Sequence, residues 1–318
     1  MTLDPQAQTL LTKLASAANP PRYEMTLAEA RALSIATATA SNDPPEPVKG
    51  VENRIIEDNG LHIPVRIYTP NAPGPLPMLL YFHGGGWVLS NLDTHDSLCR
   101  KIANRAQCIV ISVDFRLAPE HKFPAATEDS FAATCWATEH AAELNGDAQR
   151  IAVAGDSAGG NLAAVVALMA RDQNMPTLIY QVLIYPVTGY HTPGTPSYFE
   201  LGEGYNLTRE EMIWFWRSYL RDEQDAQNPY AVPMHAQALH DLPPAFILTA
   251  EYDPLRDEGE AYAAHLRENG IPVTLKRYPG MLHGFVNMSG ILDQGKQAIE
   301  DIAVALRQAF TGQAERLD

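Results

Sequence analysis

The stretch IAVAGDSAGG, residues 151–160, contains an apolar run, a glycine-flanked serine and the start of an alanine-rich segment that continues over residues 161–171. This order is typical of a buried strand that turns directly into a helix. A turn this tight holds its serine in a strained backbone conformation and exposes the hydroxyl group. Side chains at Gly155 and Gly159 would collide across the turn, so we expect glycine to be required there. The pattern predicts that Ser157 is a nucleophile.

Four further apolar runs have the length of buried strands, at residues 78–82, 108–113, 178–185 and 245–249. Their apolar residues are nearly continuous, which suits parallel strands that are covered on both faces. Helix-length segments such as residues 123–140 separate most of the runs. This alternation predicts a mostly parallel, doubly wound α/β sheet. Residues 61–68 instead alternate between apolar and polar side chains, as a half-solvated antiparallel strand does.

The segment before these strand patterns has helical character. Thr26 and Glu29 fit a capping box, in which each side chain pairs with a free N–H group at the start of a helix. The turn formers SNDPP, residues 41–45, then break the helix. We interpret residues 1–48 as an N-terminal helical cap segment.

A second segment, residues 188–234, interrupts the strand–helix alternation. It begins with glycines and prolines and then contains a helix predicted from a capping box at Thr208 and Glu211. Segments of this length inside a compact domain are usually functional. We interpret it as an insertion that covers the C-terminal edge of the sheet, with residues 49–187 and 235–318 as the catalytic domain. An ordinary crossover helix with long loops is the alternative.

A second glycine-rich motif, HGGGW, directly follows the predicted strand at residues 78–82. Its three consecutive glycines, Gly84, Gly85 and Gly86, leave backbone N–H groups without side-chain cover. Such a loop can direct two donors at a developing oxyanion. A flexible turn is the alternative, but the buried strand before the motif and the bulky Trp87 at its end favour the oxyanion interpretation.

The order of the chain narrows the choice of catalytic base. In folds with this kind of serine turn, the acid follows the serine and the histidine comes last. Two histidines lie well beyond the last apolar run, His265 and His283. His265 falls within a helical pattern, whereas His283 follows the strand-like residues 273–278 in a loop that can reach the serine. We therefore predict that His283 is the base.

The acid is expected where the preceding strand ends. The candidates after residues 245–249 are Glu251, Asp253 and Asp257. Pro254 restricts the backbone just beyond Asp253, and a helix is expected to start there. We predict that Asp253 orients the imidazole and stabilises its charged form.

The overall composition excludes several classes of partner. The formal net charge is −15, whereas phosphate backbones and anionic lipids require basic surfaces. No basic and apolar leader begins the chain, and no apolar stretch is long enough for a membrane span. The three cysteines form no Cys-x-x-Cys pair, and the histidines show no metal-ligand spacing. We expect a cytoplasmic protein without metal or organic cofactor and without nucleic-acid or membrane partners.

The motifs together resemble the bacterial hormone-sensitive lipase family of esterases. Five of them occur in the family's order between about residue 50 and the last helix: HGGGW (83–87), DFRLAPE (114–120), GDSAGG (155–160), DPLRDE (253–258) and HGF (283–285). The resemblance implies an α/β-hydrolase fold with a helical cap. It also implies that Gly85, Gly86 and Ala158 supply the oxyanion-hole N–H groups, while Gly84 shapes the loop.

The same resemblance implies a serine carboxylesterase for short- to medium-chain acyl esters, with a homodimer as a common assembly. We consider Trp87, Tyr185, Trp214 and Phe215 as candidates for the substrate pocket, although the cap's aromatic residues can equally form its own core. An amidase or peptidase would use the same triad. A non-catalytic ligand-binding protein is the alternative from another class, because a fold does not secure a function.

Overall fold

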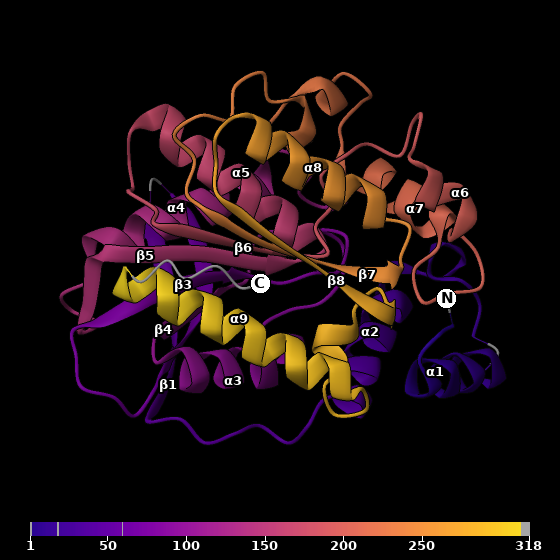
Figure 1. Cartoon of the computed structure of the whole chain (residues 1–318), viewed down its shortest axis with the longest axis horizontal. Coiled ribbons are helices and arrows are strands. Elements are labelled where there is room, and N and C mark those ends of the chain that lie inside the picture. Colours follow the sequence, from indigo (N-terminus) through magenta and orange to yellow (C-terminus); the bar gives the residue numbers. More distant parts are fainter. Residues whose placement is uncertain (1, 18, 59, 313–318) are drawn as a thin grey trace.

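The computed structural model describes residues 2–17, 19–58 and 60–312. An eight-stranded sheet runs through the molecule in the order β1-β2-β4-β3-β5-β6-β7-β8 (Figure 1). The strands are β1 (Gly50–Asp58), β2 (Leu61–Thr69), β3 (Leu76–Phe82), β4 (Ile109–Val113), β5 (Gly146–Asp156), β6 (Tyr180–Ile184), β7 (Ala245–Tyr252) and β8 (Val273–Leu282). All neighbours from β4 to β8 are parallel, while β2 is antiparallel to both β1 and β4. The predicted mostly parallel sheet is confirmed.

Helices cover both faces of this sheet, as Figure 1 shows. The longer helices are α1 (Pro5–Ser16), α2 (Leu27–Ser41), α3 (Asp96–Ala106), α4 (Ala125–Glu139), α5 (Ala158–Gln173), α7 (Arg209–Tyr219), α8 (Arg256–Glu268) and α9 (Asp293–Thr311), and a short α6 spans Pro196–Glu200. Helices α3 and α9 pack on one face, and α4, α5 and α8 pack on the other. This arrangement is the doubly wound one that the strand–helix alternation predicts.

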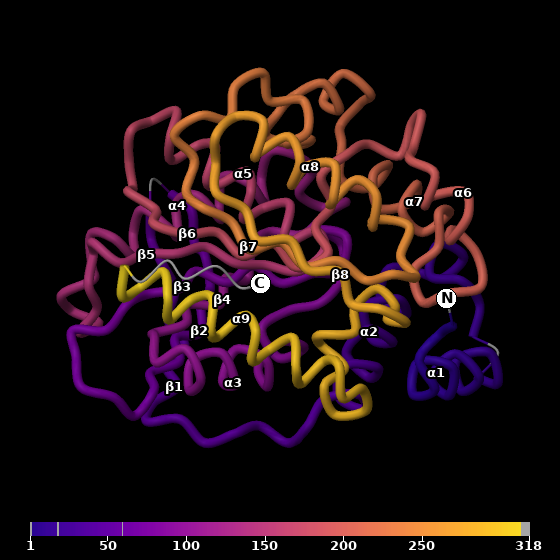
Figure 2. The backbone as a smooth tube through the Cα atoms, in the orientation of Figure 1, coloured from indigo at the N-terminus to yellow at the C-terminus, as the bar shows by residue number. Residues whose placement is uncertain are grey.

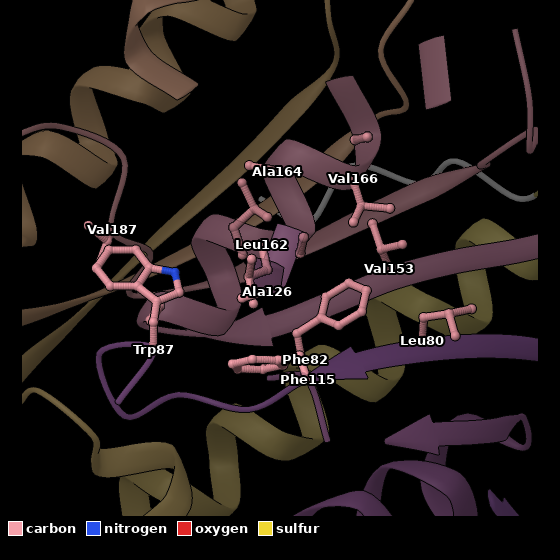
Figure 3. Packing of buried hydrophobic residues seen from close by; sticks show 14 of the residues in the cluster. Leu80, Phe82, Trp87, Phe115, Ala126, Val153, Leu162, Ala164, Val166 and Val187 are labelled. Atoms are coloured by element: carbon pink, nitrogen blue, oxygen red, sulfur yellow. The ribbon is translucent and has the colours of Figure 1, made fainter. Parts of the chain in front are cut away.

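Successive side chains of the central strands point to opposite faces, and both faces are apolar. Leu80 and Phe82 of β3 lie in the cluster that includes Leu162 and Val166 of α5, as Figure 3 shows. Leu79 and Tyr81 of the same strand lie in the cluster formed with α3 and α9. Burial on both faces explains why the central strands are recognisable as continuous apolar runs.

The edge strand β1 has no counterpart among the predicted elements. Its sequence, GVENRIIED, is mostly charged or polar, and only Ile56 is fully buried. Val51 and Ile55 are 41% and 60% exposed. Pairing with β2 over nine residues, rather than an apolar face, holds this strand in the sheet. The pattern of apolar residues along β1 therefore gives little indication of a strand.

Helices α1, α2, α6 and α7 gather at the end of the sheet to which β7 points (Figures 1 and 2). Both predicted capping boxes are present, Thr26 with Glu29 at the start of α2 and Thr208 with Glu211 at the start of α7. Arg22, which precedes α2, forms a 2.6 Å ion pair with Glu211. The N-terminal segment and the segment after β6 are therefore joined above the ends of the strands.

Among the described residues, no helix combines the length and the apolar character needed to cross a lipid bilayer.

Candidate active site

The turn between β5 and α5 has the strained geometry that its sequence predicts. Ser157 has φ 57° and ψ −119°, a conformation that non-glycine residues rarely adopt. A Cβ on Gly155 would lie 2.2 Å from the carbonyl oxygen of Gly159, and one on Gly159 would lie 1.9 Å from that of Phe82. The requirement for glycine at both positions is confirmed. The turn places Ser157 at the carboxyl end of a central parallel strand.

Three side chains from separate parts of the chain meet at this serine. The Nε2 atom of His283 lies 3.0 Å from Ser157 Oγ, and its Nδ1 atom lies 2.7 Å from Asp253 Oδ2. Asp253 follows β7 and is fully buried, whereas Ser157 and His283 are each 8% exposed. The Asp253 carboxylate accepts a hydrogen bond from the Nδ1–H group, which leaves Nε2 free to take the proton from the serine.

The competing candidates from the sequence lie elsewhere and have other partners. His265 is on α8, where its Nε2 lies 3.4 Å from the carbonyl oxygen of Ala236. Asp257 accepts a 2.9 Å hydrogen bond from the N–H of Ser197, and Glu251 accepts one of 2.7 Å from the N–H of Gly280. Neither carboxylate is bonded to the imidazole of His283.

The HGGGW loop runs beside the serine and presents backbone donors to it. The N–H group of Gly84 is occupied, because it donates to Asp156 Oδ1 at 2.9 Å. Within residues 2–17, 19–58 and 60–312, the N–H groups of Gly85 and Gly86 have no acceptor. Gly85 and Gly86 have φ values of 110° and 61°, which glycine adopts readily. Ala158 opens α5, so its N–H lacks an intrahelical partner.

These donors and the serine open into a cavity of about 140 Å³. Its wall includes the three loop glycines, Ser157 and His283, with Leu207 and Phe215 from the segment after β6. Polar side chains from distant segments complete it: Ser34, Thr37 and Ser41 of α2, Ser90, Thr94, Asn206 and Asn287. The sequence offered no signal for this polar wall, because its members are isolated small residues brought together only by packing.

The four aromatic residues considered for the substrate pocket differ in position. Only Phe215 lines the cavity. Trp87 is fully buried, and its ring stacks on Tyr219 with centroids 4.2 Å apart. Tyr185 lies 4.7 Å from the ring of His283 and is 1% exposed, while Trp214 packs beside Phe215 outside the cavity wall. Trp87 departs from the expectation because the bend after Gly86 turns its ring into the core, as Figure 3 shows.

The helix that follows Asp253 contains an unusual buried acid. Arg256 and Asp257 form a local ion pair at 2.8 Å. Glu258 is instead 2% exposed, and its Oε1 accepts hydrogen bonds from the N–H groups of Thr188 and Gly189. Burial raises the pKa of Glu258 to about 8 despite those hydrogen bonds. This side chain links α8 to the start of the segment after β6.

Among the described residues, no group of three or more His, Cys, Asp and Glu side chains could hold a metal ion.

Comparison with known proteins agrees with this geometry. A family model described as alpha/beta hydrolase fold matches residues 79–287. The chain belongs to the hormone-sensitive-lipase-like family of α/β-hydrolases. It is 45% identical over 274 residues to carboxylesterase NlhH of Mycobacterium tuberculosis, an alignment that covers 84% of this chain and 86% of that protein.

Solved structures of this family superpose on nearly the whole chain. An ester hydrolase from the metagenome of Lake Arreo has a TM-score of 0.94 at 40% identity, covering 98% of this chain and 100% of that one. The hyperthermophilic esterase of Pyrobaculum calidifontis has a TM-score of 0.93 at 44% identity, covering 97% and 99%. The likeness therefore includes the helical segments above the strand ends as well as the sheet.

Proposed function

We propose that this protein is a serine carboxylesterase that hydrolyses short- to medium-chain acyl esters through an acyl-enzyme intermediate. The observation that carries the proposal is the pair of contacts made by His283, 3.0 Å to Ser157 Oγ and 2.7 Å to Asp253 Oδ2. This alignment gives the serine a base and gives the base an orienting acid. Esterase names among the relatives support the same activity.

In the proposed mechanism, Ser157 attacks the ester carbonyl while His283 removes the hydroxyl proton. Asp253 holds the imidazole in the required tautomer and stabilises its positive charge. The N–H groups of Gly85, Gly86 and Ala158 bind the oxyanion of the tetrahedral intermediate. His283 then donates the proton to the leaving alcohol, and water hydrolyses the acyl-enzyme by the same steps in reverse. The chemistry requires no metal or organic cofactor.

The size of the cavity supports the preference for short and medium chains. A volume of about 140 Å³ suits a small acyl or alcohol group, and Phe215 forms part of its wall. The polar side chains of α2 in its wall also disfavour a long hydrocarbon chain, because burying a hydroxyl group against alkyl surface costs free energy.

The remaining expectations belong to the same proposal. Residues 1–48 and 188–234 act as the cap, and residues 49–187 with 235–318 act as the catalytic domain. The partner is a small-molecule ester in the cytoplasm, and a homodimer is the proposed assembly. Light scattering of the purified protein tests the assembly, since a monomer mass would contradict it.

The activity is tested by hydrolysis of p-nitrophenyl esters, from acetate to palmitate, by wild type, Ser157→Ala and Ser16→Ala. We expect the highest kcat/KM on acetate to hexanoate, and a loss of at least about 10⁴-fold in Ser157→Ala. Ser16 is an exposed serine of α1, so its variant controls for the substitution itself. Turnover by Ser157→Ala at the wild-type rate would contradict the assignment, and turnover only of anilides would indicate an amidase.

A further inference from the structure

A buried carboxylate lies directly behind the oxyanion loop. The Oδ1 atom of Asp156 accepts hydrogen bonds from the N–H of Gly84 at 2.9 Å and from the hydroxyl group of Tyr81 at 2.8 Å. Asp156 is 5% exposed. A Cβ on Gly84 would lie 2.4 Å from Asp156 Oδ2, so only glycine allows this approach. The carboxylate therefore holds the residue that precedes the two free loop donors.

A buried histidine faces the same oxygen. The Nε2 atom of His95 lies 3.1 Å from Asp156 Oδ1, and His95 is 2% exposed. The contact is too poorly aligned to be a hydrogen bond. A lone pair on Nε2 would face a carboxylate oxygen at short range, which is repulsive. We therefore place a proton on Nε2.

The second ring nitrogen of His95 also faces a polar side chain. Its Nδ1 atom lies 2.8 Å from the Oγ1 atom of Thr94. That hydroxyl group has a single hydrogen, which it donates to the carbonyl oxygen of Asn91 at 2.7 Å. Thr94 and Asn91 therefore hold the ring of His95 with its Nε2 atom directed at Asp156.

Several titratable groups surround Asp156 and His95. Burial raises the pKa of Asp156, but the attraction of His95 and the hydrogen bond from Tyr81 outweigh it, so the pKa lies below its usual value. The ring of His83 lies 5.6 Å from that of His95, and Asp114 lies 3.8 Å from His83 Nε2.

Three further titratable groups near the pair are neutral. Burial raises the pKa of the hydroxyl groups of Tyr81 and Tyr185 and of the thiol of Cys99 on α3. These three groups therefore add no charge beside Asp156.

We propose that His95 and Asp156 are positioning residues of the oxyanion loop, in which the ionised carboxylate fixes Gly84 so that the N–H groups of Gly85 and Gly86 point at the reacting oxygen. This inference rests on the proposed esterase function. Both residues act through the backbone of Gly84. A protonated carboxyl group would hold that N–H more weakly, because a charged acceptor forms the stronger hydrogen bond.

Three variants and one control separate this role from general stability. Asp156→Asn keeps the shape and removes the charge. His95→Leu removes the polar ring, and His95→Gln keeps an N–H donor. Asp301→Asn is the matched control, because Asp301 likewise accepts from a tyrosine, Tyr278, and also from Lys276, but on α9 at the β8 edge.

The readouts are kcat and KM on p-nitrophenyl butyrate and the inhibition constant of an alkyl trifluoromethyl ketone, whose adduct with serine places an oxyanion in the loop. We expect kcat to fall about 10- to 100-fold in Asp156→Asn and His95→Leu, since a misplaced donor costs less than a donor removed outright. KM should stay within threefold, and the inhibition constant should rise in parallel with the loss of kcat. His95→Gln should lose less than His95→Leu.

The inference is overturned if the wild type is active and the two variants Asp156→Asn and His95→Gln, once shown to be folded, retain kcat and inhibition constants within threefold of the wild-type values. An equal loss in Asp301→Asn would also overturn it, since the effect would then be general. Melting followed by circular dichroism identifies the folded variants. If His95→Leu fails to fold, His95→Gln and Asp156→Asn test the inference without it. A wild type without turnover would instead refute the proposed esterase function.

Discussion

The ring of Phe215, on helix α7, lies so close to Gly86 that a Cβ on Gly86 would come within 2.1 Å of the Phe215 Cδ1 atom. The segment after β6 is thus in direct contact with the oxyanion loop. Gly86 serves two purposes, since it adopts φ 61° and leaves room for the aromatic ring that bounds the cavity. Substrate size and oxyanion binding are consequently determined at one contact.

Replacement of this ring should change the preferred chain length. In Phe215→Ala the cavity gains the volume of the ring, so longer acyl groups should fit. We expect the ratio of kcat/KM for p-nitrophenyl octanoate to that for the butyrate to rise about tenfold, the order of effect of small changes in apolar pockets. Phe199→Ala, at a residue 65% exposed, is the control and should leave the ratio unchanged. An unchanged ratio in Phe215→Ala would show that the acyl chain does not reach this wall.

The two aspartates of the DPLRDE motif should differ sharply. Asp253→Asn presents an amide to His283 Nδ1, which favours the wrong tautomer, and we expect kcat to fall about 10⁴-fold. Asp257→Asn loses only contacts with Ser197 and Arg256 and should retain kcat within about fivefold. Steady-state kinetics on one ester compares them. A larger loss of kcat in Asp257→Asn than in Asp253→Asn would indicate that Asp257, and not Asp253, is the acid of the triad.

Glu258 should make stability depend on pH. Its pKa is about 8 in the folded protein against 4.5 as a free side chain, so the folded state holds the proton more tightly. The free energy of unfolding should therefore decrease as pH rises from about 5 to 8. Glu258→Gln, which cannot ionise, should show a smaller decrease over that range.

Urea unfolding of both proteins at pH 5, 6.5 and 8 measures this difference. Subtracting one pH profile from the other cancels the contributions of all other groups. Parallel profiles would mean that Glu258 is ionised in the folded protein throughout.

Replacing glycine by alanine in the turn around Ser157 should destabilise the protein. Gly159→Ala places a Cβ 1.9 Å from the carbonyl oxygen of Phe82, and relief requires a shift of β3 or α5. We expect a loss of about 3 kcal/mol or more in the free energy of unfolding, at the upper end for overpacked sites. Gly50→Ala, whose Cβ would meet nothing nearer than 3.9 Å, is the control. A stable Gly159→Ala protein with full activity would contradict the predicted crowding.

Much of the fold was predictable because the relevant physics is local. A continuous apolar run is buried on both faces wherever it lies in a central sheet, and a capping box pairs groups three residues apart, so β3 and the start of α7 could be recognised directly. The requirement for glycine at Gly155 is local in the same way, since a Cβ there would meet Gly159 within one turn, whereas Gly159 avoids a collision with Phe82 of the distant strand β3. Strand β1 was not predicted, because its pairing with β2, rather than the pattern of its own apolar residues, holds it in the sheet.

The candidate triad was chosen from the sequence by chain order and by the turn and strand patterns that flank each residue, and the structure brings Ser157, Asp253 and His283 together. The sequence alone indicated that the serine, the acid and the histidine each follow a strand. Only the tertiary structure decided that Phe215 rather than Trp87 borders the cavity, that small residues of α2 form its polar wall, and that His95 faces Asp156 behind the loop. These relationships join segments far apart in the chain, and their geometry follows from the packing of whole elements, which no local pattern encodes.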